Sequence, residues 1–268
     1  MIDLHSHILH GLDDGSQSLE ESIEMAKIAA EDGITKIVAT PHMFRNNFDG
    51  NNIEAVNKAR GELAASLQEN DIKIELFIGA EVHISHNLID EIKKNRTNMV
   101  INGSQYLLVE FPMSHIFSGI KELFFDLMSE GIIPIIAHPE RNMMFMKNPS
   151  FLYEMLRMGV LTQANSGSFL GFYGRRAEET VNYFVSWNFI HFVGSDSHNN
   201  RTMAPKLSEA VMALQKRIGQ DAVHALVWDN PQAVLDNEDI VFRPEPVNPA
   251  KDSKSIKINL PFFKKRKK

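Results

Sequence analysis

The first seven residues end in Asp3-Leu4-His5-Ser6-His7, where one residue separates two histidines. Successive side chains of a β-strand point to opposite faces, so His5 and His7 share a face if this segment is a strand. Two imidazoles on one face provide half of a metal site. Alone, the pair is equally compatible with two polar residues at a chain end, so the remaining histidines and acids must decide.

Similar residues recur where later apolar segments end, and a mixed histidine and carboxylate set without sulfur suits Mn²⁺, Fe²⁺ or Zn²⁺. The candidate ligands are His5, His7, Asp14, His42, Glu81, Glu110, His138, Asp196 and His198. Asp13 neighbours Asp14 and is the alternative ligand that the sequence leaves open. This set is too large for one ion and predicts two or three. Such centres suit hydrolysis of phosphate esters, because the ions lower the pKa of water and stabilise phosphoryl oxygens.

Three arginines, Arg45, Arg141 and Arg201, each follow a candidate histidine ligand by three residues. A guanidinium group can bind phosphate through two parallel hydrogen bonds. A surface salt bridge would explain any one of them, but the repeated spacing favours at least one phosphate-binding arginine. Phe172 and Tyr173 could line a pocket for a ring, or simply anchor their loop.

Seven apolar segments with residues typical of strands position these candidates. They are Ile2–His5, Lys36–Thr40, Glu75–Ala80, Tyr106–Phe111, Ile132–Ala137, Leu161–Asn165 and Phe189–Gly194. Amphipathic segments between them predict helices, the first starting at the capping pattern Ser18-Leu19-Glu20-Glu21. This alternation predicts a parallel sheet, most simply closed as a barrel, and α/β barrels build their sites at the carboxyl ends of the strands.

Charge divides the chain into two parts, which we expect to be a domain at residues 1–243 and a disordered tail at residues 244–268. The formal net charge is −6, yet the segment from Lys251 to Lys268 carries a net +7 and leaves −13 for the rest. An acidic body argues against binding nucleic acid. The basic tail is either solvated or a weak contact with anionic lipid, where each basic residue contributes about 1 kcal/mol.

The chain contains no cysteine, which excludes disulfides and thiol nucleophiles. We recognise no signal sequence and no long apolar segment of the kind that crosses a membrane. The sequence therefore predicts a cytoplasmic protein. If the tail binds lipid, the protein would lie at the inner face of the membrane.

Five motifs together resemble those of the polymerase and histidinol phosphatase (PHP) superfamily. They are Asp3-Leu4-His5-Ser6-His7, Thr40-Pro41-His42, Gly79-Ala80-Glu81, Ala137-His138-Pro139-Glu140-Arg141 and Ser195-Asp196-Ser197-His198. With Asp13-Asp14-Gly15-Ser16 and Glu110, residues 1 to about 240 most resemble bacterial protein-tyrosine phosphatases of the CpsB/YwqE type. The resemblance implies a distorted (β/α)₇ TIM-like barrel, usually with three manganese ions. It also implies that the substrate is the phosphotyrosine tail of a bacterial tyrosine autokinase that controls capsule or exopolysaccharide synthesis.

The resemblance also implies a division of the ligands among three ions. One ion would be held by His5, His7, Glu81 and Asp196, a second by Glu81, Glu110 and His138, and a third by Asp14, His42 and His198. Arg141 and Arg201 match phosphate-binding positions. The alternatives are a histidinol-phosphatase-like enzyme for small phosphomonoesters, a phosphodiesterase or nuclease, and a metal-stabilised regulatory protein without catalysis.

Overall fold

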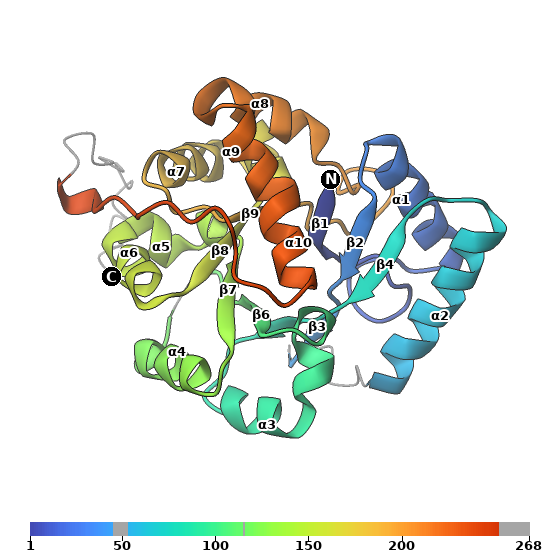
Figure 1. Ribbon diagram of the computed structural model, residues 1–268, viewed down its shortest axis with the longest axis horizontal. Coiled ribbons are helices and arrows are strands. Elements are labelled where there is room, and N and C mark those ends of the chain that lie inside the picture. The colour runs from blue at the N-terminus through green and yellow to red at the C-terminus, as the bar shows by residue number, and fades with distance from the viewer. Residues whose placement is uncertain (45–52, 115, 252–268) are drawn as a thin grey trace, which may run out of the picture.

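Strands and helices alternate along the chain as the sequence predicts, and each of the seven predicted strand segments contains a strand. The computed structural model describes residues 1–44, 53–114 and 116–251 (Figure 1). The strands are β1 (Ile2–Ser6), β2 (Lys36–Ala39), β3 (His42–Met43), β4 (Glu75–Ile78), β5 (Glu81–His83), β6 (Tyr106–Glu110), β7 (Ile133–Ala137), β8 (Leu161–Asn165) and β9 (Phe192–Gly194). The helices are α1 (Leu19–Glu31), α2 (Ile53–Glu69), α3 (Leu88–Met99), α4 (Ile120–Ser129), α5 (Met143–Lys147), α6 (Pro149–Met158), α7 (Arg175–Ser186), α8 (Ser208–Ile218), α9 (Gln220–His224) and α10 (Asn230–Leu235).

All strand pairs are parallel, but the strands form two sheets rather than one continuous barrel. The described strands have the orders β1-β2-β4 and β3-β5-β6-β7-β8-β9. The short strands β3 and β5 begin just beyond the second and third predicted segments, after a break in the chain's strand pairing. Pro41, between β2 and β3, has no N–H to donate. Gly79, between β4 and β5, lies so close to Ile101 that a Cβ there would be 3.2 Å from the Ile101 Cα. A hydrogen bond from the Gly79 N–H to the Ala39 carbonyl (2.9 Å) connects the strands at the interruption.

The outer strands β1 and β9 lie side by side without a regular ladder. One isolated parallel bridge joins Ser6 to Ser197, just beyond the end of β9. Nearer the start of β1, the Asp3 carboxylate accepts hydrogen bonds from the Ser195 N–H (2.9 Å) and hydroxyl (2.6 Å). Asp3 also accepts from the backbone N–H of His5 (3.2 Å). A side chain therefore fastens these strands where backbone pairing is incomplete.

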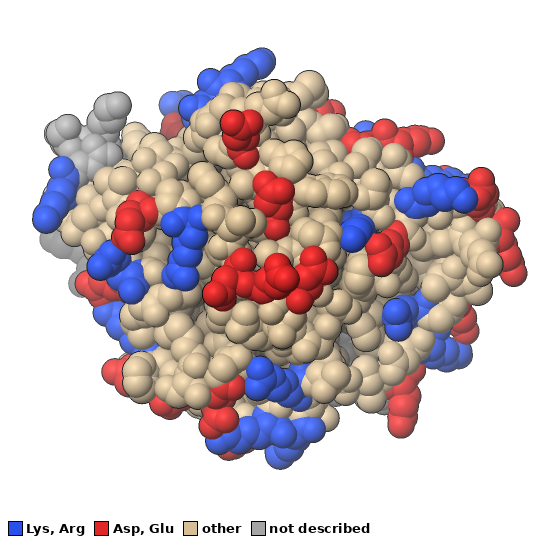
Figure 2. All heavy atoms as spheres, in the orientation of Figure 1, with Lys and Arg blue, Asp and Glu red and all other residues tan. Residues whose placement is uncertain are grey.

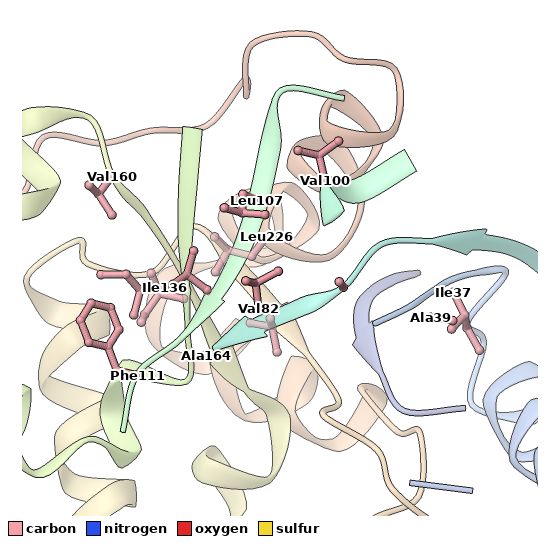
Figure 3. Close-up of a cluster of buried hydrophobic side chains, with 14 of the residues drawn as sticks. Ile37, Ala39, Val82, Val100, Leu107, Phe111, Ile136, Val160, Ala164 and Leu226 are labelled. Carbon is pink, nitrogen blue, oxygen red and sulfur yellow. The ribbon is translucent and has the colours of Figure 1, made fainter. Parts of the chain in front are cut away.

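Alternate residues of the central strands face two different apolar clusters, as expected for strands buried on both faces. On β6, Tyr106 and Leu108 join an inner cluster, while Leu107 and Val109 join the larger outer one. Figure 3 shows part of the outer cluster, with Leu107 near side chains from the neighbouring strands. Glu110 continues the inner series at the carboxyl end of β6. The Glu110 carboxylate therefore lies on the same face of β6 as Tyr106 and Leu108, next along the strand.

The chain beyond Arg243 continues along the body, past the domain boundary expected from sequence. The Val247 N–H donates to the Trp187 carbonyl (2.8 Å), the Asn188 side chain donates to the Glu245 carbonyl (3.0 Å), and Pro249 is buried. Residues 252–268, which hold most of the basic charge, lie outside the described part. Among the described residues, no helix combines the length and the apolar content needed to cross a membrane.

Acidic and basic side chains are interspersed over the face of the molecule drawn in Figure 2. A row of acidic side chains crosses the middle of that face. No broad basic surface covers the described residues on this side, which agrees with the acidic charge of the body.

Candidate metal centre

All nine residues predicted as ligands meet at the carboxyl ends of the parallel strands. Three groups have donor atoms that lie within 4.8 Å of one another: His5, His7, Glu81 and Asp196; His7, Asp14, His42 and His198; and His42, Glu81 and Glu110. The first group has the membership that the resemblance implies. The grouping differs for Glu110, which lies near His42, whereas Nε2 of His138 lies 3.0 Å from Oε1 of Glu81.

The hydrogen bonds around His5 and His7 fix which ring nitrogen carries a proton when each ring is neutral. Nδ1 of His5 is 2.7 Å from Oε1 of Gln163, and the Gln163 amide group donates to the Ala164 carbonyl (2.7 Å). Nδ1 of His7 is 2.7 Å from Oδ2 of Asp13. Both partners are acceptors, so each Nδ1 must donate. The Nε2 atoms then carry lone pairs, as a metal ligand requires.

The Nε2 atoms of His5 and His7 face carboxylate oxygens, an arrangement that fits a bound cation. The two Nε2 atoms are 3.3 Å apart, and each lies 3.3 Å from Oε2 of Glu81. Although burial opposes charge on His5, attraction by Glu81 and Asp196 raises its pKa to about 9. The arrangement therefore requires positive charge between these atoms, supplied by protons or by metal ions. The donor set fits a metal centre.

The two adjacent aspartates occupy different positions. Asp13 is buried, and Oδ2 accepts from the backbone N–H of His42 (2.9 Å) as well as from His7, while Oδ1 accepts from the Gly15 N–H (2.9 Å). Asp14 places Oδ1 3.3 Å from Nε2 of His42 and 3.4 Å from Nε2 of His198. Hydrogen bonding with His198 and His42 holds the pKa of Asp14 far below its usual value. Asp13 thus orients His7, a candidate ligand, and Asp14 directly faces the candidate ligands His42 and His198.

Two of the candidate ligands have backbone conformations that are uncommon for residues other than glycine. His138 has φ of 33° and Asp196 has φ of 52°. Such left-handed conformations are costly, and the surrounding structure must hold them in place. For His138, the backbone N–H donates to the Gln163 carbonyl (2.8 Å). Nδ1 of His198 lies 2.9 Å from the Asp196 carbonyl, which leaves its Nε2 facing Asp14.

Of the three predicted phosphate-binding arginines, the structure brings Arg141 to the centre. Its Nη1 donates to Oδ2 of Asp196 (2.6 Å), and its guanidinium carbon lies 4.1 Å from the centre of the Tyr173 ring. Burial raises the pKa of Tyr173 to about 12, with a further contribution from the negative charge of Asp196. Arg201 is exposed on the loop after β9, where its backbone N–H donates to Asn199 (2.9 Å). Arg45 lies outside the described residues.

Sequence reasoning assigns no role to two polar residues beside the centre, and His83 lies there as well. Gln163 orients His5, and Asn165 donates to Oδ2 of Asp196 (2.6 Å). Both follow Leu161 of the inner cluster at steps of two along β8, so the strand alternation alone predicts that they face the site. His83, next to Glu110 on the neighbouring strand, places Nδ1 3.3 Å from Oε2 of that carboxylate.

The fold and the site define a parallel α/β protein with a buried histidine and carboxylate cluster that can bind metal. A family profile described as "Capsular polysaccharide synthesis, CpsB/CapC" matches residues 1–236. The chain belongs to the CpsB/CapC family.

Named relatives agree with this assignment. The tyrosine-protein phosphatase YwqE of Bacillus subtilis is 39% identical over 249 residues, covering 92% of this chain and 96% of YwqE. The putative tyrosine-protein phosphatase CapC of Staphylococcus aureus is 38% identical over 199 residues, covering 74% of this chain and 77% of CapC. A crystal structure from work on YwqE and on CpsB of Streptococcus pneumoniae, described as metal-dependent tyrosine phosphatases, superposes with a TM-score of 0.87 at 37% identity and covers 92% of this chain and 99% of that chain.

Proposed function

We propose that this protein is a metal-dependent protein-tyrosine phosphatase. Its substrate would be phosphotyrosine in the C-terminal tail of a bacterial tyrosine kinase, and its action would regulate capsule or exopolysaccharide synthesis. The observation that carries the proposal is the buried ligand cluster with the guanidinium of Arg141 at its edge. The likeness to phosphatases of the same family over nearly the whole chain supports it.

The proposed ligands are the nine residues of the cluster, with Mn²⁺ as the metal, three ions as the expected number, and Fe²⁺ or Zn²⁺ as alternatives. Bound ions would supply nucleophilic water at neutral pH and share the charge of the phosphoryl oxygens. In this proposal Arg141 binds the phosphate through the guanidinium N–H groups that do not contact Asp196. Asp13 and Gln163 hold the rings of His7 and His5 in place.

The phosphotyrosine assignment agrees with the chemistry of the leaving group. A phenol has a pKa near 10, well below that of an alkyl alcohol, so its departure depends less on protonation. Arg201 and Arg45 would also bind the phosphate in this proposal. Their role is proposed from sequence alone: the described contact of Arg201 is with Asn199, and Arg45 lies outside the described residues. These three arginines are our candidates for catalytic and substrate-binding groups.

We further propose that the two sheets form a distorted (β/α)₇ barrel, with β2 and β3 as one bent strand and β4 and β5 as another. The bridge at Ser6 and the hydrogen bond from the Asp196 N–H to the His5 carbonyl (2.9 Å) support a closed arrangement. We keep 1–243 as the proposed catalytic domain and 244–268 as the basic tail, although residues 244–251 lie against the body. We propose a cytoplasmic protein whose tail makes weak contact with anionic membrane surfaces.

Metal removal and a comparison of substrates test the proposal. Chelation should abolish hydrolysis of p-nitrophenyl phosphate, and Mn²⁺ should restore it. A phosphotyrosyl peptide should be turned over with higher kcat/KM than histidinol phosphate, and single-stranded DNA should remain intact. Preference for histidinol phosphate would favour a small-molecule phosphatase, and cleavage of DNA would favour a nuclease. Full activity after removal of all metal would disprove metal dependence.

A second measurement separates catalysis from a purely regulatory role. Replacing His138 by Ala removes the imidazole 3.0 Å from Glu81 and should abolish turnover. Binding of the kinase tail should survive, because Arg141 keeps its contact with Asp196. If the wild-type protein binds the tail but releases no phosphate with Mn²⁺, Fe²⁺ or Zn²⁺, the regulatory alternative replaces our proposal.

A further inference from the structure

A cavity of about 220 Å³ lies between the loop that follows β8 and the loop that follows β9. The first loop begins with a short helical turn, η3 (Ser166–Leu170), and continues to Tyr173. Leu170, Phe172, Met203 and Ala204 form apolar walls of the cavity, beside the ring of Tyr173. Polar groups complete the lining, and no lining residue belongs to the proposed ligand set; these polar residues are Ser166, Ser195, Thr202, Lys206 and Glu209.

Two residues that line the cavity also neighbour residues of the metal centre. Tyr173 lines the cavity and also packs against the Arg141 guanidinium, 4.1 Å from the ring centre. Ser195, another lining residue, directly precedes Asp196. A polypeptide with its phosphate at Arg141 would therefore have a neighbouring residue within reach of this cavity.

The aromatic wall is held in place before any substrate binds. The Phe172 N–H donates to the Gly167 carbonyl (3.0 Å), and a Cβ on Gly167 would lie 3.0 Å from Cδ2 of Phe172 and 3.1 Å from Cε2 of Tyr173. Both rings thus pack directly on a glycine. Even so, the Phe172 residue is 66% exposed, which leaves a large apolar surface at the cavity.

The size and the charges of the cavity indicate what it binds. Whole small-molecule sites commonly measure about 300–1,000 Å³, so this cavity suits one side chain better than a complete ligand. Lys206 and Glu209 contribute one charge of each sign to the lining, which favours neither an anion nor a cation.

We propose that this cavity is a specificity subsite for an apolar or aromatic side chain that flanks phosphotyrosine in the substrate. This inference rests on the proposed phosphatase function and extends it to substrate choice. The subsite contributes binding energy only to substrates that carry such a neighbour. It contributes nothing to p-nitrophenyl phosphate, which has none.

The test uses phosphotyrosyl peptides that differ only in the residues beside phosphotyrosine, either Phe or Gly on one side or the other. Wild-type protein should prefer one Phe peptide over its Gly counterpart by about tenfold in kcat/KM, the lower end of what one apolar group achieves in a pocket. Ala204→Leu, which fills the cavity, and Phe172→Ala, which removes its wall, should each reduce that ratio toward one. Turnover of p-nitrophenyl phosphate should stay within about twofold in both variants, because a twofold change is well under 1 kcal/mol.

Phe125→Ala is the matched control, because Phe125 is 62% exposed and lies on α4. It should keep the wild-type preference. Equal kcat/KM for Phe and Gly peptides in the wild type, or an unchanged preference in both cavity variants, would overturn the subsite. If no phosphotyrosyl peptide is hydrolysed while another phosphate ester is, the proposed tyrosine-phosphatase function itself fails.

Discussion

Replacing Asp13 by Asn should weaken metal binding without removing a ligand. The Asp13 carboxylate accepts three hydrogen bonds, from Nδ1 of His7 (2.7 Å) and from the backbone N–H groups of His42 and Gly15 (both 2.9 Å). Asparagine keeps one acceptor oxygen and replaces the other with a donor, so at least one of these donors must face an NH₂ group. The imidazole of His7 then loses its charged partner, its fixed orientation, or both.

The expected magnitude follows from two independent quantities. A hydrogen bond to a charged group contributes about 1.5–3 kcal/mol. Loss of a carboxylate that orients a metal-bound histidine commonly costs about 10–100-fold in metal affinity or activity, which is about 1.4–2.7 kcal/mol. We therefore expect the Mn²⁺ dissociation constant of Asp13→Asn to rise by one to two orders of magnitude. Saturating Mn²⁺ should restore most of the activity.

The measurement is a Mn²⁺ titration combined with bound-metal content and hydrolysis of p-nitrophenyl phosphate. Asp14→Asn is the matched comparison, because Asp14 lies 3.3 Å from Nε2 of His42 and directly faces the ligand group. It should bind fewer ions even at saturation. Unchanged Mn²⁺ affinity in Asp13→Asn would refute the orienting role. Loss of an ion from Asp13→Asn but not from Asp14→Asn would reverse the two assignments.

Three further predictions concern protons and the arginine. The pKa of His5, raised from 6.5 to about 9, makes its charge stabilise the metal-free fold fully below pH 6.5 and progressively less as the pH rises through 9. Metal binding at pH 7.5 should therefore release protons, and buffer-independent calorimetric heats would contradict this. Burial raises the pKa of Glu140, so its charged form destabilises the fold at pH 7.5. Glu140→Gln should therefore raise the melting temperature at pH 7.5 but not below pH 4.5, where the carboxyl group is protonated in both states. Equal shifts of the melting temperature at both pH values would refute this. Because a cation–π contact contributes about 0.5–2 kcal/mol, Tyr173→Leu should raise KM for p-nitrophenyl phosphate by about twofold or more. Tyr173→Phe, which keeps the ring against Arg141, should not, and equal KM values for the two variants would contradict this.

The sequence predicts well where the candidate ligands meet, because that prediction depends on one regularity. Parallel strands place their carboxyl ends at one edge, so acids and histidines at those ends must come together. The positions of His42, Glu81 and Glu110 follow directly from this rule. It does not predict where strands bend or break. The short strands β3 and β5 follow breaks at Pro41 and Gly79, and the expected single sheet is divided in two.

Finer assignments depend on distances that strand ends do not determine. Glu110 was grouped with His138 from the resemblance, yet the donor atoms group it with His42. The left-handed backbone of His138 directs its ring toward Oε1 of Glu81. A residue that reverses its backbone just after a strand leaves the alternation on which the sequence argument depends. Its partner therefore has to be read from coordinates.

The hydrogen-bond partners of His5 and His7 distinguish two histidines that look equivalent in the sequence. His5 donates to the neutral amide of Gln163, and His7 donates to the charged carboxylate of Asp13. A carboxylate partner increases the basicity of an imidazole more than an amide does, and the pKa of His7 is raised well above 6.5 despite burial. Of these two histidines, His7 is the one that belongs to two of the candidate ligand groups. His7, the more basic of the two imidazoles, therefore lies where it could contribute to two metal sites. Loss of the Asp13 charge should disturb both ligand groups that contain His7. Loss of the Gln163 amide should disturb only the group that contains His5.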